Sequence, residues 1–192
     1  AFLELYLCLL SAYLAVDRAE ERILFVRATR WIFCLVLFYA GLQKFVHGYY
    51  FHGQYLAFSV WIESFRPVLA ALVPASEFAR IVGLGVEVGA GPYLVDSRPL
   101  LIASNLVWIA EIIIPFGLLA RPTRALAVVA SLALVAAIEA GARELFFGML
   151  YANLALLFTT SDWHQRFRPV FALALAALLL SRLGILPEAT FF

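Results

Sequence analysis

The sequence predicts an all-α polytopic membrane protein with about six hydrophobic helices. Hydrophobic residues make up 65% of the 192-residue chain and charged residues only 14%, whereas soluble domains are roughly half apolar and a quarter charged. The mean hydropathy is +0.94, and several apolar segments reach the roughly 20 residues that a helix needs to cross a bilayer. The lipid bilayer is therefore the expected environment, because a soluble fold of this size could not bury so much apolar surface.

The first two helices are separated by a charged turn. An apolar run over residues 2–16 predicts the first helix, and the turn DRAEER follows at 17–22. The second helix is expected over 24–46, with Arg27 and Arg30 near its start.

The segment 47–96 has a different character. It carries scattered acidic and basic residues and is interrupted by Pro67, Pro74 and Pro92. Such an amphipathic, broken pattern predicts short helices that lie in the membrane interface or re-enter the membrane partway.

After Pro99 the apolar runs become regular, and very short turns separate them. Short turns require antiparallel neighbours, so the last four helices should form an up-down bundle. The whole chain, 1–192, is then a single transmembrane domain. The four expected spans are 99–120, 123–141, 144–160 and 167–185.

The distribution of Lys and Arg between short loops predicts the orientation. The turns at 17–22, 121–124 and 161–168, with Arg27 and Arg30 nearby, carry more of these residues than the opposite side. This side should be cytoplasmic, so the segment 47–96 faces outward. A bacterial inner membrane is the expected location.

Glu111 is the clearest candidate for function within a span. It lies far from either charged flank of its apolar run, and an ionised group at that depth costs several kcal/mol unless it is paired or hydrated. Asn105, Trp108 and Pro115 fall on the same helical stripe. The interpretations are a proton-exchanging carboxyl, a ligand for a headgroup, or a structural Glu paired with an arginine or a backbone donor.

Lys44 ends the second expected helix, and His47, Tyr50 and His52 follow it closely. One interpretation is a lysine that extends to the headgroups, with the tyrosines in an interfacial aromatic belt. The alternative is a base in a dehydrated pocket, with the histidines and Tyr50 helping to bind a ligand. No metal site is expected, because the histidines are five residues apart without a carboxylate between them.

A known family pattern matches these residues. A helix that carries Arg30 and ends in AGLxK, followed by aromatic residues and Gly53, resembles the transmembrane module of vitamin K-dependent carboxylase-like (HTTM) proteins, and more loosely the DoxX family. The stretch NLVWIAEIIIPFGLLARPTRALAV, with Glu111 and Pro115, resembles the glutamate-bearing helix of that module. The resemblance implies that Lys44 deprotonates a quinol in an outward-facing apolar pocket. A full carboxylase is not expected, since no large extramembrane domain accompanies the helices.

These observations favour an accessory membrane subunit of a larger complex, redox or photosynthetic, that contacts other membrane subunits and lines a quinone or lipid site near Lys44 and Glu111. Electron transport and complex assembly are the corresponding processes. The alternatives are a small carboxylase-like enzyme with Lys44 as base, and a proton-coupled transporter that uses Glu111. No basic tract points to nucleic acid.

Overall fold

The structure, a computed structural model, describes residues 19–84, 93–143 and 145–159, and a few single positions beyond them. The helices expected over 2–16 and 167–185 therefore lie outside the continuous described ranges.

Three of the described helices are long and apolar enough to cross a membrane, as expected for an integral membrane protein. They are α2 (Ala19–His47), α6 (Arg98–Leu119) and α7 (Arg124–Ala142). Each coincides with a segment for which the apolar runs predict a membrane helix. The described residues contain helices, turns and loops but no strand, in agreement with the all-α prediction.

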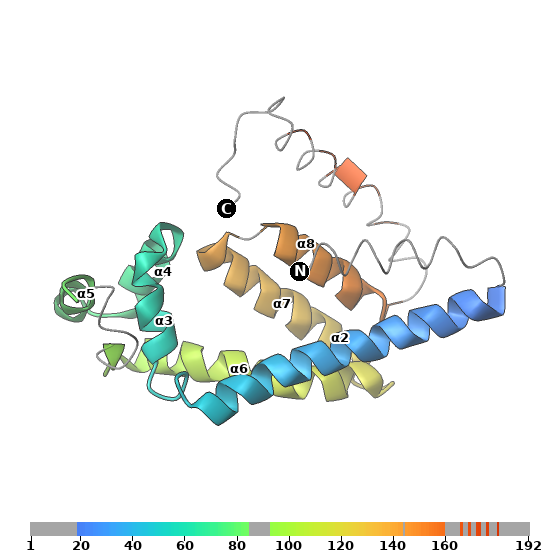
Figure 1. The fold of residues 1–192 in the computed structure, drawn as a ribbon, viewed down its shortest axis with the longest axis horizontal. Helices are drawn as coiled ribbons and strands as arrows, with labels where there is room; N and C mark the ends of the chain where they lie inside the picture. The colour runs from blue at the N-terminus through green and yellow to red at the C-terminus, as the bar shows by residue number, and fades with distance from the viewer. Residues whose placement is uncertain are drawn as a thin grey trace.

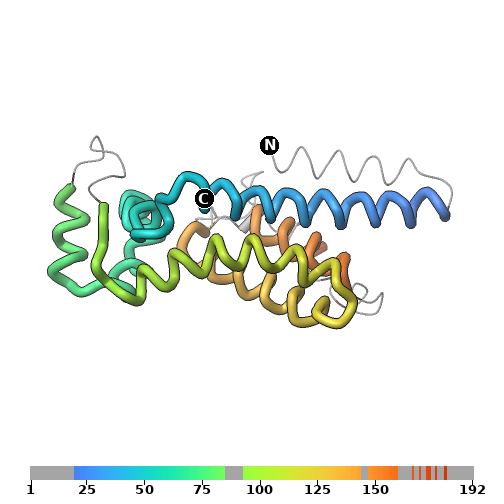
Figure 2. Tube along the Cα trace, turned by 90° about the horizontal axis from the view of Figure 1, so that it is seen from below, coloured from blue at the N-terminus to red at the C-terminus, as the bar shows by residue number. Residues whose placement is uncertain are grey.

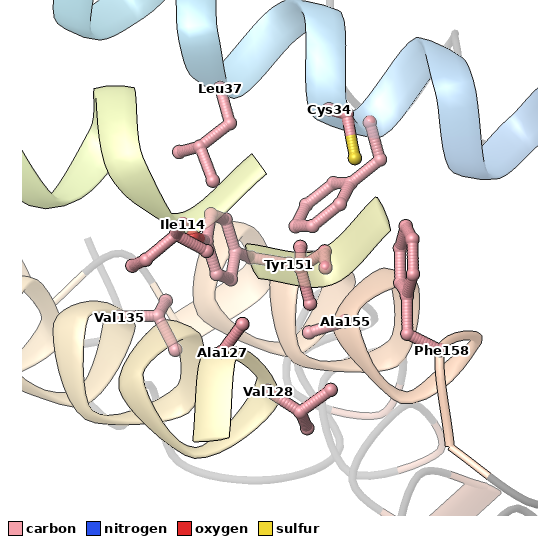
Figure 3. Close-up of a cluster of buried hydrophobic side chains, with 11 residues drawn as sticks. Cys34, Leu37, Ile114, Ala127, Val128, Val135, Tyr151, Ala155 and Phe158 are labelled. Carbon is pink, nitrogen blue, oxygen red and sulfur yellow. The ribbon is translucent and has the colours of Figure 1, made fainter. Parts of the chain in front are cut away.

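The long helices are antiparallel neighbours. Helix α2 lies beside α6 along most of its length (Figure 2), and α7 packs against α6 and α8 (Figure 1). Side chains from all four helices, among them Leu37, Ile114, Val135 and Tyr151, form a common buried core (Figure 3). Large apolar side chains such as Leu126, Val129 and Ile113 remain mostly exposed, and a lipid environment would cover them.

Helix α8 covers Leu145–Leu156, whereas the sequence predicts a span over 144–160. Its 12 residues extend over about 18 Å, which is short of the roughly 30 Å of a hydrocarbon core. The chain leaves the helix through turns in which the amides of Leu157 and Phe158 bond to the carbonyls of Leu154 and Ala155. Only Leu157 and Phe158 separate the end of the helix from Thr159, so the apolar run places that end a few residues too late.

The segment after α2 folds into short helices with a small core of its own. These are α3 (Gln54–Phe58), η1 (Ser59–Trp61), η2 (Glu63–Phe65), α4 (Arg66–Leu72) and α5 (Ala75–Val82). Tyr93, Leu69, Ile81 and Leu100 are buried among them. Because Leu100 belongs to α6, this core fastens the segment to the start of α6, at one end of the bundle (Figure 1). The short helices agree with the pattern of the sequence, while their placement in a membrane interface stays a prediction.

Candidate functional site

The site begins with a close approach of α2 and α6 at Gly41. A Cβ atom added there would lie 2.9 Å from the Cβ of Glu111, from Cγ1 of Ile112 and from the carbonyl oxygen of Trp108. Real Cβ atoms do not come so near, so any larger residue would force the helices apart. The glycine of the AGLxK sequence therefore sets the distance between the two helices.

Lys44 lies one turn beyond Gly41 on the same helix and reaches Glu111. Its Nζ atom is 2.5 Å from Oε1 and 2.6 Å from Oε2 of the carboxylate. The side chain of Glu111 is only 6% exposed and that of Lys44 is 23% exposed. Each charge neutralises the other, which lowers the cost of burying both. One interpretation of Glu111 was a structural Glu paired with an arginine or a backbone donor. The structure supplies a cationic partner, but this partner is Lys44 and not an arginine.

The ion pair is part of the lining of a pocket of about 410 Å³. Most of the wall is apolar and comes from α2, α6, α7, α8 and the short helices that follow α2. Along α2 the lining runs from Thr29 to Lys44, which is about 22 Å of helix. Leu37 and Tyr151 belong both to the wall and to the core shown in Figure 3. The result is a mostly apolar space with one ion pair in its wall.

Tyr50, Tyr55 and Ser59 add polar groups near the ion pair. Tyr50 is 7% exposed; its ring stacks on that of Tyr55 at 4.9 Å and lies 5.5 Å from Nζ of Lys44. Burial, followed by the charges of Tyr55 and Glu111, raises the pKa of the Tyr50 hydroxyl. This hydroxyl therefore stays protonated and can donate a hydrogen bond.

Asn105 and Trp108 lie beside the pocket and are not part of its lining. The amide of Asn105 donates to the carbonyl of Phe51 at 3.2 Å, and Nε1 of Trp108 donates to Oδ1 of Asn105 at 3.0 Å. Ser104 Oγ donates to the carbonyl of Tyr50 at 2.6 Å. These side chains hold the loop that follows α2 against α6, and so position Tyr50.

The structure does not bring the two predicted histidines to the pocket. His47 and His52 are exposed, neither lines the pocket, and the ring of His47 stacks on Tyr49 at 6.4 Å. Within the described ranges, no three His, Cys, Asp or Glu side chains lie close enough to hold a metal ion.

Sequence reasoning missed one buried polar contact of the pocket wall. Ser131 of α7 donates to the hydroxyl of Tyr151 of α8 at 3.1 Å, and both are buried. Ser131 stands in an uninterrupted apolar run, and its partner is 20 residues away. A polar residue within such a run was the only signal available, and it does not indicate the partner.

Comparison of the chain with protein-family models, curated proteins and solved structures finds no match. The resemblance to the carboxylase-like and DoxX families therefore remains a prediction that rests on the quoted residues.

Proposed function

We propose that the chain is an accessory subunit of a membrane complex, and that it holds one amphiphilic molecule of the quinone or lipid class in the pocket beside Lys44 and Glu111. The observation that carries this proposal is the Lys44–Glu111 ion pair in the lining of a mostly apolar pocket of about 410 Å³. Ligand pockets commonly measure roughly 300–1,000 Å³ and combine apolar walls with a few polar groups.

The polar groups of the pocket favour a ligand whose headgroup both donates and accepts hydrogen bonds. The ammonium of Lys44 and the hydroxyl of Tyr50 are donors, and the carboxylate of Glu111 is an acceptor. All three residues line the pocket. The apolar wall along α2 suits a single hydrocarbon or isoprenoid chain, whose burial contributes roughly 0.8 kcal/mol per CH₂ group.

A redox or photosynthetic complex is the proposed setting, because a bound quinone exchanges electrons with neighbouring cofactors. The exposed apolar surfaces of the long helices are available to partner helices as well as to lipid.

The second candidate is a small membrane enzyme that uses Lys44 as base, as the carboxylase-like resemblance implies. The place of Lys44 in the pocket lining favours it, because a base at this position would face a bound quinol. General base catalysis needs such a group within hydrogen-bond reach of the proton that it removes.

The test is purification in mild detergent, followed by solvent extraction and mass spectrometry of the bound molecules. We expect a quinone or single-chain lipid at up to one molecule per chain. Ala40→Phe narrows the pocket beside the ion pair, since Ala40 lines it, and should abolish binding. Ala136→Phe is the matched control, because Ala136 is exposed on α7. Equal binding by the folded variants, or a wild-type protein that binds no quinone or lipid, contradicts the proposal.

The same preparation separates the two candidates. Stoichiometric membrane partners support the accessory subunit. A protein that purifies alone and turns over a quinol, with turnover lost in Lys44→Ala, supports the enzyme and contradicts the accessory role.

A further inference from the structure

Four arginines gather at the end of the bundle opposite the cap formed by α3–α5. Arg27 and Arg30 belong to α2, Arg121 lies in the turn after α6, and Arg124 opens α7. Arg30 lies within electrostatic range of both Arg27 and Arg124. Three segments of the chain thus contribute positive charge to one place, which we call the arginine cluster (Arg27, Arg30, Arg121 and Arg124).

Two members of the arginine cluster are held in place by the ends of helices. Nε of Arg30 donates to the carbonyl of Leu157, just after α8, at 2.8 Å, and its Nη2 bonds to the same oxygen. Arg124 donates to the carbonyls of Leu118 and Leu119, at the end of α6, at 3.0 and 3.3 Å. The guanidinium groups are therefore preorganised, and the partial negative charge of helix carboxyl ends offsets only part of their charge.

Among the described residues, no carboxylate forms an ion pair with the arginine cluster. The described residues place none of its four members in an ion pair, and Arg27 and Arg121 are exposed. Like charges that converge without a counter-ion repel one another, so an anion bound there removes an unfavourable term. Arg121 and Arg124 lie between the ends of α6 and α7, and Arg27 and Arg30 lie within α2, three helices long enough to cross a membrane.

We infer that the arginine cluster binds the headgroup of an anionic phospholipid. Planar guanidinium groups pair with phosphate oxygens through two parallel hydrogen bonds. Basic pockets between membrane helices on the cytoplasmic side are suited to such headgroups, and the cluster is on the side that the Lys/Arg distribution predicts to be cytoplasmic. This site is at the other end of the bundle from Lys44 and Glu111, so the inference does not depend on the proposed function.

The test is native mass spectrometry of the detergent-purified chain, titrated with phosphatidylglycerol and, separately, with phosphatidylcholine. The wild-type protein should retain phosphatidylglycerol preferentially, and more weakly as salt is raised. The double variant Arg27→Gln/Arg121→Gln should lose about 30-fold in phosphatidylglycerol affinity. It should stay folded, because neither arginine makes a hydrogen bond within the described structure.

The matched control is Arg98→Gln/Arg143→Gln, which removes the same charge from the opposite ends of α6 and α7. We expect its affinity for phosphatidylglycerol to change by less than about twofold. Equal losses in the two double variants mean that only net charge matters, which overturns the inference. Equal retention of both lipids by the wild-type protein also overturns it, and leaves an acidic segment of a protein partner as the occupant.

Discussion

Removing one member of the Lys44–Glu111 pair should destabilise the protein far more than removing both. At 2.5 Å, an effective dielectric constant of about 20 corresponds to roughly 6–7 kcal/mol of attraction, from which the cost of removing both charges from water is subtracted. Lys44→Met leaves the carboxylate of Glu111 buried without its cation, which should lower the free energy of unfolding by about 3–5 kcal/mol. Glu111→Leu should cost less, about 1–3 kcal/mol, because Lys44 is 23% exposed and can extend toward water.

The double variant Lys44→Met/Glu111→Leu replaces the pair with apolar side chains of similar size. Its free energy of unfolding should lie within about 1 kcal/mol of wild type, so that the two changes are coupled by at least about 3 kcal/mol. Reversible unfolding of the four proteins in mixed micelles, followed by circular dichroism, measures this coupling. Additive effects, or a Lys44→Met variant as stable as wild type, would refute the buried neutral pair. The same double variant should bind no quinone or lipid although it is folded, which separates the role of the pair in binding from its role in stability.

Three further predictions follow from the geometry of the site. Gly41→Ala should lower the free energy of unfolding by about 1–3 kcal/mol, because the new Cβ atom meets α6 at 2.9 Å. The control is Gly83→Ala, at a site with more room, which should change the free energy of unfolding by less than about 0.5 kcal/mol. Equal effects of the two variants would contradict the close approach of α2 and α6. The pKa of the Tyr50 hydroxyl is raised in the folded protein, so the stabilising contribution of the protonated hydroxyl is complete below about pH 10 and declines as the pH rises above that value. Tyr50→Phe should therefore lose less stability than the wild-type protein at alkaline pH. Parallel pH profiles of the two proteins would refute this. Leu37 is buried in the pocket wall, so Leu37→Ala should lower the free energy of unfolding by about 2–5 kcal/mol and enlarge the pocket. In a competition assay, the variant should then bind bulkier quinones than the wild-type protein does. If that variant is as stable as wild type, Leu37 does not support the pocket wall.

The long helices could be read from the sequence because an apolar run of about 20 residues has few alternatives to a membrane helix. The shorter elements were harder to place. Helix α8 ends at Leu156, two apolar residues before Thr159, and Leu157 and Phe158 lie in a turn. The carbonyl of Leu157 accepts a hydrogen bond from Arg30, a contact that hydropathy does not indicate.

The candidate site was predicted unevenly for a similar reason. Glu111 was singled out as a charge within an apolar span, Lys44 as the charged end of a helix and Tyr50 as a residue close to Lys44, and all three line one pocket. His47 and His52 were also included because they are close to Lys44 along the chain, yet both are exposed and neither lines the pocket. Nearness to Lys44 in the sequence therefore does not decide which of these residues line the pocket.

The cost of an isolated charge in a bilayer follows from residue type and position, so the sequence already indicates that Glu111 needs a partner or water. It does not say that this partner is Lys44, 67 residues away. That outcome depends on the antiparallel register of α2 and α6 and on their close contact at Gly41. Register and spacing are properties of packed helices, because they arise from the fit of many side chains at once, and no single segment of the chain contains them.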